Sequence, residues 1–63
     1  MEKITLSDGT VATVITEEND VYKFYICETN AEAAEVCHTL VLLGNQAVVD
    51  FNSHWGWFVR ARK

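Results

Sequence analysis

"TNAEAAEVCHTLVLLGN", residues 29–45, is the one stretch of this chain with helical periodicity, and it decides the fold. Thr29 and Glu32 have the spacing of a capping box, in which a hydroxyl and a carboxylate accept the free N–H groups of the first turn. Gly44 and Asn45 are typical of a helix end, because both residue types tolerate the left-handed backbone conformation. The spacing also predicts an apolar stripe that faces the core, made of Ala33, Val36, Cys37, Leu40 and Leu43.

Upstream of this helix, residues 3–16 alternate in polarity and are interrupted by Asp8 and Gly9, a strong signal for a two-residue hairpin turn. A polar loop over residues 17–20 leads to an aromatic third strand over residues 21–27. The predicted cross-strand pairs are Leu6–Val11, Ile4–Thr13, Thr13–Phe24, Ile15–Tyr22 and Val11–Ile26. These residues then form the face that packs on the helix, and the open face carries Val14, Lys23 and Tyr25.

Downstream, residues 46–63 predict a second hairpin with two tryptophans in its returning strand. A loop with an odd number of residues pairs Phe51 with Trp55 and Val49 with Trp57, so the large apolar side chains share one face. A loop with an even number divides them between two faces. Because a one-residue slip moves every side chain to the other face, burial favours the odd register. We therefore expect both tryptophans to face the helix, and the open face to carry Phe58, Arg60 and Arg62.

Together these elements predict an α+β fold with the order βββαββ, in which one helix packs on one face of a single twisted, mainly antiparallel, five-stranded sheet. A right-handed crossover through the helix suggests the strand order 3-2-1-5-4. With 63 residues, we expect one small domain, residues 1–63, near the lower size limit for a chain that folds on its own core.

Residues that could carry chemistry are few. Cys27, Cys37, His38 and His54 lack the close paired spacing of a zinc site, and neighbouring side chains on a helix point about 100° apart. No glycine-rich loop suited to phosphates and no candidate pair of buried carboxylates is present. We therefore expect no metal site, no cofactor and no enzymatic activity, and we expect both cysteines to be reduced thiols.

The charge is unevenly distributed. Residues 1–50 hold nine acidic and two basic residues, whereas residues 51–63 hold three basic residues and no acidic one. An acidic body disfavours binding to nucleic acids or anionic membranes and favours a basic partner. The first ten residues lack the apolar segment of a signal peptide, so we expect a cytoplasmic location and no membrane segment.

Two surfaces are candidates for binding a partner. The first is acidic, and it is either a docking surface or simply the charge that keeps the protein in solution: Glu17, Glu18, Asp20, Glu28, Glu32 and Glu35. The second is the open face of the sheet, where aromatic and basic side chains alternate: Lys23, Tyr25, Phe58, Arg60 and Arg62. This open face could also form a homodimer, since monomers seldom expose broad apolar patches.

The layout resembles that of a phage protein family. A strand ending in "ATV" (residues 12–14), an acidic turn, an aromatic strand, "ETNAEAAEV" (residues 28–36) and a final strand are similar to the small RNA-polymerase inhibitor of T7-like phages. The similarity covers roughly residues 12–51, and the tryptophan-rich hairpin departs from it. The resemblance implies a phage-encoded protein that occupies a surface of the host machinery, and it assigns no individual residue.

We therefore expect a non-enzymatic, acidic protein-binding module. Its partner would be a host protein with a basic, nucleic-acid-binding surface, as for anti-CRISPR, anti-restriction or RNA-polymerase inhibitors. Direct nucleic-acid binding is not expected in this interpretation. The alternatives are a small single-stranded nucleic-acid binder that uses the open sheet face, and a structural subunit of a larger assembly.

Overall fold

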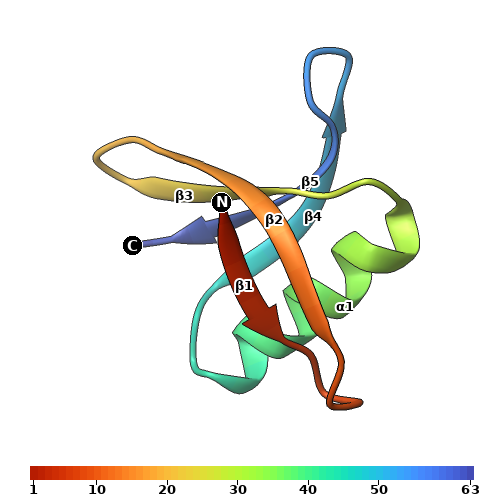
Figure 1. Ribbon diagram of the computed structural model, residues 1–63. Helices are drawn as coiled ribbons and strands as arrows, with labels where there is room; N and C mark the ends of the chain where they lie inside the picture. The colour runs from red at the N-terminus through yellow and green to blue at the C-terminus, as the bar shows by residue number, and fades with distance from the viewer.

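A computed structural model describes all residues from 1 to 63 and confirms the α+β fold (Figure 1). Three strands precede the single helix and two follow it: β1 (Glu2–Thr5), β2 (Val11–Glu18), β3 (Tyr22–Ile26), α1 (Asn30–Leu42), β4 (Ala47–Asn52) and β5 (Gly56–Arg62). The strands form one open sheet, and every neighbouring pair is antiparallel.

The strand order is β1-β2-β3-β5-β4, so the expected order 3-2-1-5-4 is wrong. The last strand pairs with β3, not with β1. Short connections at both ends of α1 carry the chain from β3 to β4, which lies two strand positions away. The tight turn after β4 then returns β5 into the space between them, where it gains a partner on each side. The helix consequently packs across β3, β5 and β4.

The helix begins and ends where the sequence predicts. The Thr29 hydroxyl accepts the Glu32 N–H at 3.0 Å, and the Glu32 carboxylate accepts the Glu28 N–H at 3.1 Å. At the other end, the Asn45 and Gly44 N–H groups donate to the carbonyls of Leu40 and Val41, which is a Schellman motif with Gly44 at φ +93°. The buried stripe is formed by Ala33, Val36, Thr39 and Leu40, whereas Leu43, predicted to join it, is 73% exposed.

The first hairpin has a three-residue turn, not the predicted two-residue turn. Asp8 accepts hydrogen bonds from the Thr10 N–H and hydroxyl, and the Leu6 N–H donates to the Thr10 carbonyl across the turn. The register therefore pairs Ile4 with Ala12, where Thr13 was expected. This slip of one residue moves the side chains of β2 to the opposite faces.

The second turn is also displaced. Asn19 accepts the N–H groups of Val21 and Tyr22, so the turn lies at Asp20 and Val21. Glu17 and Glu18, predicted to be loop residues, belong to β2 and pair with Phe24 and Lys23.

As a result of the slip in the first hairpin, β2 and β3 pack towards α1 with the face that was predicted to be open. Ala12, Val14 and Tyr25 are buried in the core, whereas Val11 and Ile15 are more than half exposed. In the C-terminal strands the alternation is as predicted, and Val49, Trp57 and Val59 face the helix. The expected pairs are wrong, however: Phe51 pairs with Trp57 and Val49 with Val59, because the turn begins one residue later than expected. The core is small, and its buried members are Ile4, Ala12, Val14, Tyr25, Cys27, Ala33, Val36, Leu40, Val59 and Ala61.

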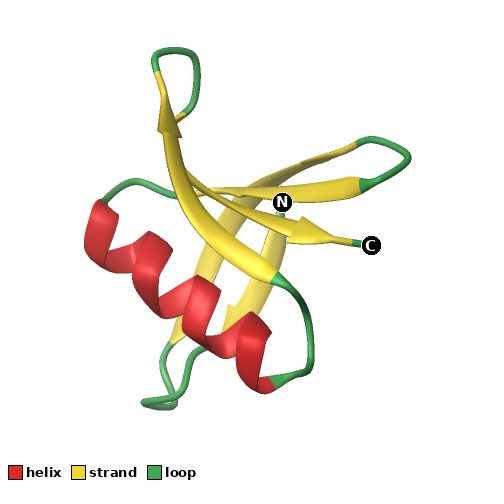
Figure 2. Cartoon of the chain, turned by 180° about the vertical axis from the view of Figure 1, so that it is seen from behind, coloured by secondary structure: helices red, strands yellow, loops and turns green.

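The sheet is strongly curved. In Figures 1 and 2, it curls round the helix: β4 at one edge runs alongside α1, and β1 at the other edge crosses near the C-terminal end of α1. The side of the sheet turned away from α1 has no element packed on it.

Candidate interaction surface

The side of the sheet turned away from α1, called here the helix-free face, is set by the strand registers. Residues whose neighbours on the same strand point into the core must point away from it, because side chains alternate along a strand. The members are Ile15 and Glu17 on β2; Tyr22, Phe24 and Ile26 on β3; Phe58, Arg60 and Arg62 on β5; and Val48 and Asp50 on β4.

An aromatic cluster occupies the middle of this face. The rings of Phe24 and Trp55 lie 5.1 Å apart between centroids, and those of Trp55 and Phe58 lie 5.2 Å apart in an edge-to-face arrangement. Trp55 belongs to the turn between β4 and β5, so the expectation that it faces the helix is wrong. Its ring instead covers this face. Phe58 lies on the predicted face but is only 5% exposed, because Phe24 and Trp55 pack against it.

Two arginines border the cluster. The Arg60 guanidinium lies over the Tyr22 ring, 5.2 Å from its centroid, and Arg62 follows two residues later on the same face. The two ion pairs of the structure join Lys23 to Glu2 and Lys63 to Glu18, so neither arginine is in an ion pair.

Lys23 and Tyr25 do not share this surface, contrary to prediction. Tyr25 is 7% exposed and belongs to the core. Lys23 lies on the same side of the sheet as Tyr25. Its ammonium is 5.2 Å from the Tyr25 ring centroid and 2.7 Å from a Glu2 carboxylate oxygen. The hydrogen bond to Glu2 raises the pKa of Lys23 above its usual value. The three-residue first turn explains the difference, since its one-residue slip exchanges the two faces of β2 and β3 relative to β1, whereas the second turn shifts its pairing by an even number of residues and exchanges none.

The six acidic residues proposed as a docking surface form two separate groups. Glu17, Glu18 and Asp20 lie at the β2–β3 turn, whereas Glu28, Glu32 and Glu35 lie beyond the other end of β3, around the start of α1 (Figure 1). By strand rise, Asp20 lies roughly 25 Å from Glu28 along β3, whereas Glu18, which is paired with Lys23, lies roughly 16 Å from it. Glu18 pairs with Lys63 and Glu32 is part of the helix cap, so these two have structural partners.

The residues that could bind a metal or act in catalysis do not lie together. No group of three or more His, Cys, Asp or Glu side chains has the arrangement of a metal site. Both cysteines are free, and Cys27 is buried. Burial, with a smaller contribution from the Glu32 charge, raises the pKa of the Cys27 thiol from 9.0 to about 11, so this thiol stays protonated at neutral pH. A protonated, buried thiol is a poor nucleophile and a poor metal ligand.

Sequence reasoning missed Tyr22, Phe24 and Trp55 as surface residues. The signal was present in the alternation of "VYKFYIC", residues 21–27, which has one aromatic set on each face. Choosing between the sets required the length of the β1–β2 turn, and this depends on the hydrogen bonds between Asp8 and Thr10.

Apolar side chains are also exposed away from the aromatic cluster. At the C-terminal end of α1 and along β4, five residues are between 46% and 73% exposed: Val41, Leu42, Leu43, Val48 and Phe51. A monomer of this size rarely leaves so many large apolar side chains in water without a binding role. The sole helix, α1, has neither the length nor the apolar character of a membrane span.

Comparisons with protein-family models, curated proteins and solved structures found no match for this chain.

Proposed function

We propose that this protein is a non-enzymatic protein-binding module whose working surface is the helix-free face of the sheet. The observation that carries the proposal is the aromatic cluster of Phe24, Trp55 and Phe58, bordered by Arg60 and Arg62. Trp, Tyr and Arg are the residue types that dominate the binding energy of protein interfaces. Here Tyr22, Trp55 and Arg60 are half-buried on one face of the sheet with no helix or strand packed on them, whereas Phe58 lies beneath Phe24 and Trp55.

The acidic residues have a narrower role in this proposal than the sequence suggests. Glu17 shares the helix-free face, and Asp20 lies at its end, in the β2–β3 turn. These carboxylates would steer a partner with a basic surface towards the aromatic cluster, because complementary charge speeds encounter and fixes orientation. Glu32 and Glu35 belong to α1, which lies on the opposite side of the sheet from this face.

The biological role proposed is inhibition of a host protein that handles nucleic acid. Support comes from the acidic net charge of −4, and from the resemblance of residues 12–51 to the RNA-polymerase inhibitor of T7-like phages. A protein of this kind acts by occupying a surface, so it needs a binding face but no catalytic group.

The test is affinity capture from a bacterial lysate with matched charge-changing variants. Ile15→Lys and Arg62→Glu alter exposed positions of the helix-free face, whereas Glu28→Lys and Glu35→Lys alter the helix start and leave the Glu32 cap intact. We expect the wild type and the helix variants to capture the same protein, and the face variants to lose it. Loss of that protein only with the helix variants would overturn the proposal.

A second candidate function is the binding of single-stranded nucleic acid by the same face. Stacked aromatic rings next to arginines are the observation in its favour, since bases stack on such rings and phosphates pair with such cations. Glu17 and Asp50 on the same face oppose it. Salt-sensitive binding of an oligonucleotide that Arg62→Glu abolishes would favour this candidate over the protein-binding one.

A further inference from the structure

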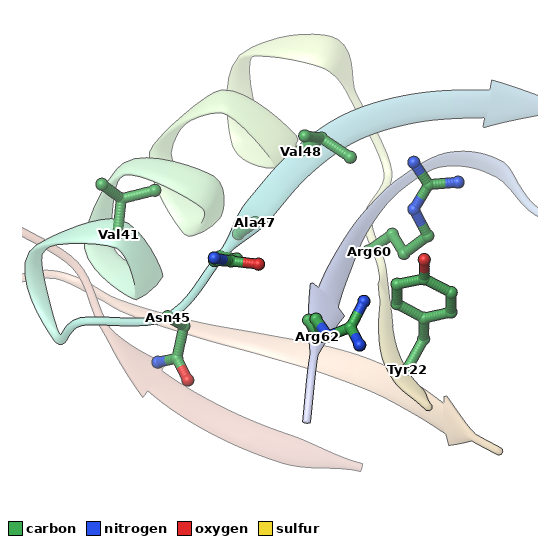
Figure 3. Close-up of a pocket in the computed structure, with 8 residues that line it drawn as sticks. Tyr22, Val41, Asn45, Ala47, Val48, Arg60 and Arg62 are labelled. Carbon is green, nitrogen blue, oxygen red and sulfur yellow. The ribbon is translucent and has the colours of Figure 1, made fainter. Parts of the chain in front are cut away.

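A hollow at the start of β4 combines cationic and apolar walls. It has a volume of about 390 Å³. Its lining comes from β3, β4, β5, the end of α1 and the α1–β4 connection: Tyr22, Val41, Asn45, Gln46, Ala47, Val48, Arg60 and Arg62. In Figure 3, Arg60 and Tyr22 lie on one side of the hollow, Val41 and Asn45 on the other, and Arg62 and Val48 between them.

The cationic wall is unusual for an acidic protein. Of five basic side chains, Lys23 and Lys63 have carboxylate partners, and two of the remaining three, Arg60 and Arg62, line this one hollow. The Arg60 guanidinium lies over the Tyr22 ring, 5.2 Å from its centroid, and it is in no ion pair, so its N–H groups are free to donate. Arg60 is therefore held in place for an anion before any ligand arrives.

The opposite wall suits an apolar or planar group. Val41 and Val48 are 51% and 46% exposed, so their methyl groups are available for contact. The Asn45 amide donates to the Leu40 carbonyl, which leaves its own carbonyl oxygen free as an acceptor. An acceptor beside apolar surface is the combination that a nucleobase, with its polar edge and apolar faces, can use.

We propose that this hollow binds a phosphomonoester carried on a small planar body, of the nucleoside 5′-monophosphate type. Two guanidinium groups match the double charge of a terminal phosphate and can bind its oxygens bidentately, whereas a carboxylate would satisfy only one of them. The volume of about 390 Å³ lies in the usual range for small-ligand pockets. The hollow shares Tyr22, Val48, Arg60 and Arg62 with the helix-free face, but binding of such a ligand goes beyond the protein-binding role and does not depend on it.

The test is a titration of the isotope-labelled protein, followed by NMR, with adenosine 5′-monophosphate, inorganic phosphate and adenosine. We expect saturable shifts at Gln46, Val48, Arg60 and Arg62 with the monophosphate, weaker binding of inorganic phosphate, and none of adenosine. Such a phosphate could come from a free nucleotide or from the 5′ end of a nucleic-acid strand, and a 5′-phosphorylated trinucleotide distinguishes these two sources. Binding of the trinucleotide, whether tighter or weaker than that of the monophosphate, supports the site. No shift with the monophosphate, or equal binding of inorganic phosphate, overturns the proposal, as does binding of a phosphoserine peptide in place of the nucleotide.

Variants assign the contacts. We expect Arg60→Gln and Arg62→Gln each to weaken binding about tenfold, as the loss of a charge-assisted hydrogen bond does. Tyr22→Leu removes the ring under Arg60 and should weaken binding about two- to fivefold, the value of a cation–π contact. Lys3→Gln makes the same change of charge on β1, outside the hollow, and should have no effect. Equal weakening by Lys3→Gln would mean that only net charge matters, and would overturn the site.

Discussion

At the scale of single residues, the stability of this protein depends on a few small side chains. Val36 on α1 and Val59 on β5 are completely buried, and Val14 is 2% exposed. A domain of this size has a core that contributes only about 3–5 kcal/mol of net stability. Each fully buried methyl group is therefore a large share of the total.

We expect Val59→Ala to lower the free energy of unfolding by about 2 kcal/mol, because it removes two buried methyl groups and leaves a cavity. Val48→Ala on the adjacent strand is the matched control, since Val48 is 46% exposed, and it should cost well under 1 kcal/mol. Urea denaturation of both variants measures the difference. Equal losses would mean that β5 does not lie under the helix.

The buried Cys27 thiol makes stability depend on pH in alkaline solution. Its pKa is raised from 9.0 to about 11, so between these values the unfolded chain loses the proton while the folded chain keeps it. The free energy of unfolding should therefore fall as pH rises through this window. We expect this fall to be steeper in Cys37→Ala, which retains the buried thiol, than in Cys27→Ala. Identical slopes would contradict the burial of Cys27.

At the scale of elements, the helix could be predicted from sequence and the strand registers could not. The cap at Thr29 and the Schellman motif at Gly44 are local, so a few neighbouring residues determine them. A strand register depends instead on the length of the turn, because one residue more or less in the turn shifts the pairing of the whole strand. Asp8 holds Thr10 in a three-residue turn, and that one hydrogen-bonded pair exchanges the faces of β2 and β3 relative to the prediction.

The helix cap gives a prediction for α1. Thr29→Ala removes the acceptor of the Glu32 N–H, so we expect a loss of about 1 kcal/mol in the free energy of unfolding. Thr29→Ser keeps the hydroxyl and should lose little. If both variants were equally destabilised in thermal denaturation, the methyl group and not the hydrogen bond would be responsible.

The free edge of β4 leads to a prediction about self-association. Gln46 accepts the Arg62 N–H, so the even-numbered residues of β4 bond to β5 and the odd-numbered ones point their N–H groups outwards. The Asp50 carboxylate accepts one of these, the Phe51 N–H, at 2.8 Å, and places a negative charge on the edge. Such charges prevent edge-to-edge pairing.

We therefore expect the wild type to sediment as a monomer when dilute, and Asp50→Ala to associate as its concentration rises. Asp20→Ala, which removes a charge at a turn, should remain monomeric. A wild-type dimer that persists on dilution would instead support an assembly through the open sheet.

At the scale of the whole molecule, only part of the helix-free face could be placed from the sequence. Phe58, Arg60 and Arg62 were assigned to the correct face, because the C-terminal hairpin has the same alternation as predicted. Tyr22, Phe24 and Trp55 joined them only through pairing of β3 with β5, a contact between residues more than thirty positions apart. No local pattern encodes such a contact, and the strand order was wrong for the same reason.

NMR of the labelled protein in complex with the partner that it captures shows whether the helix-free face is the binding surface. We predict that the largest shifts will lie at Tyr22, Phe24, Trp55 and Arg60. Shifts confined to Glu28, Glu35 and their neighbours on α1 would contradict the claim and return the function to the acidic surface.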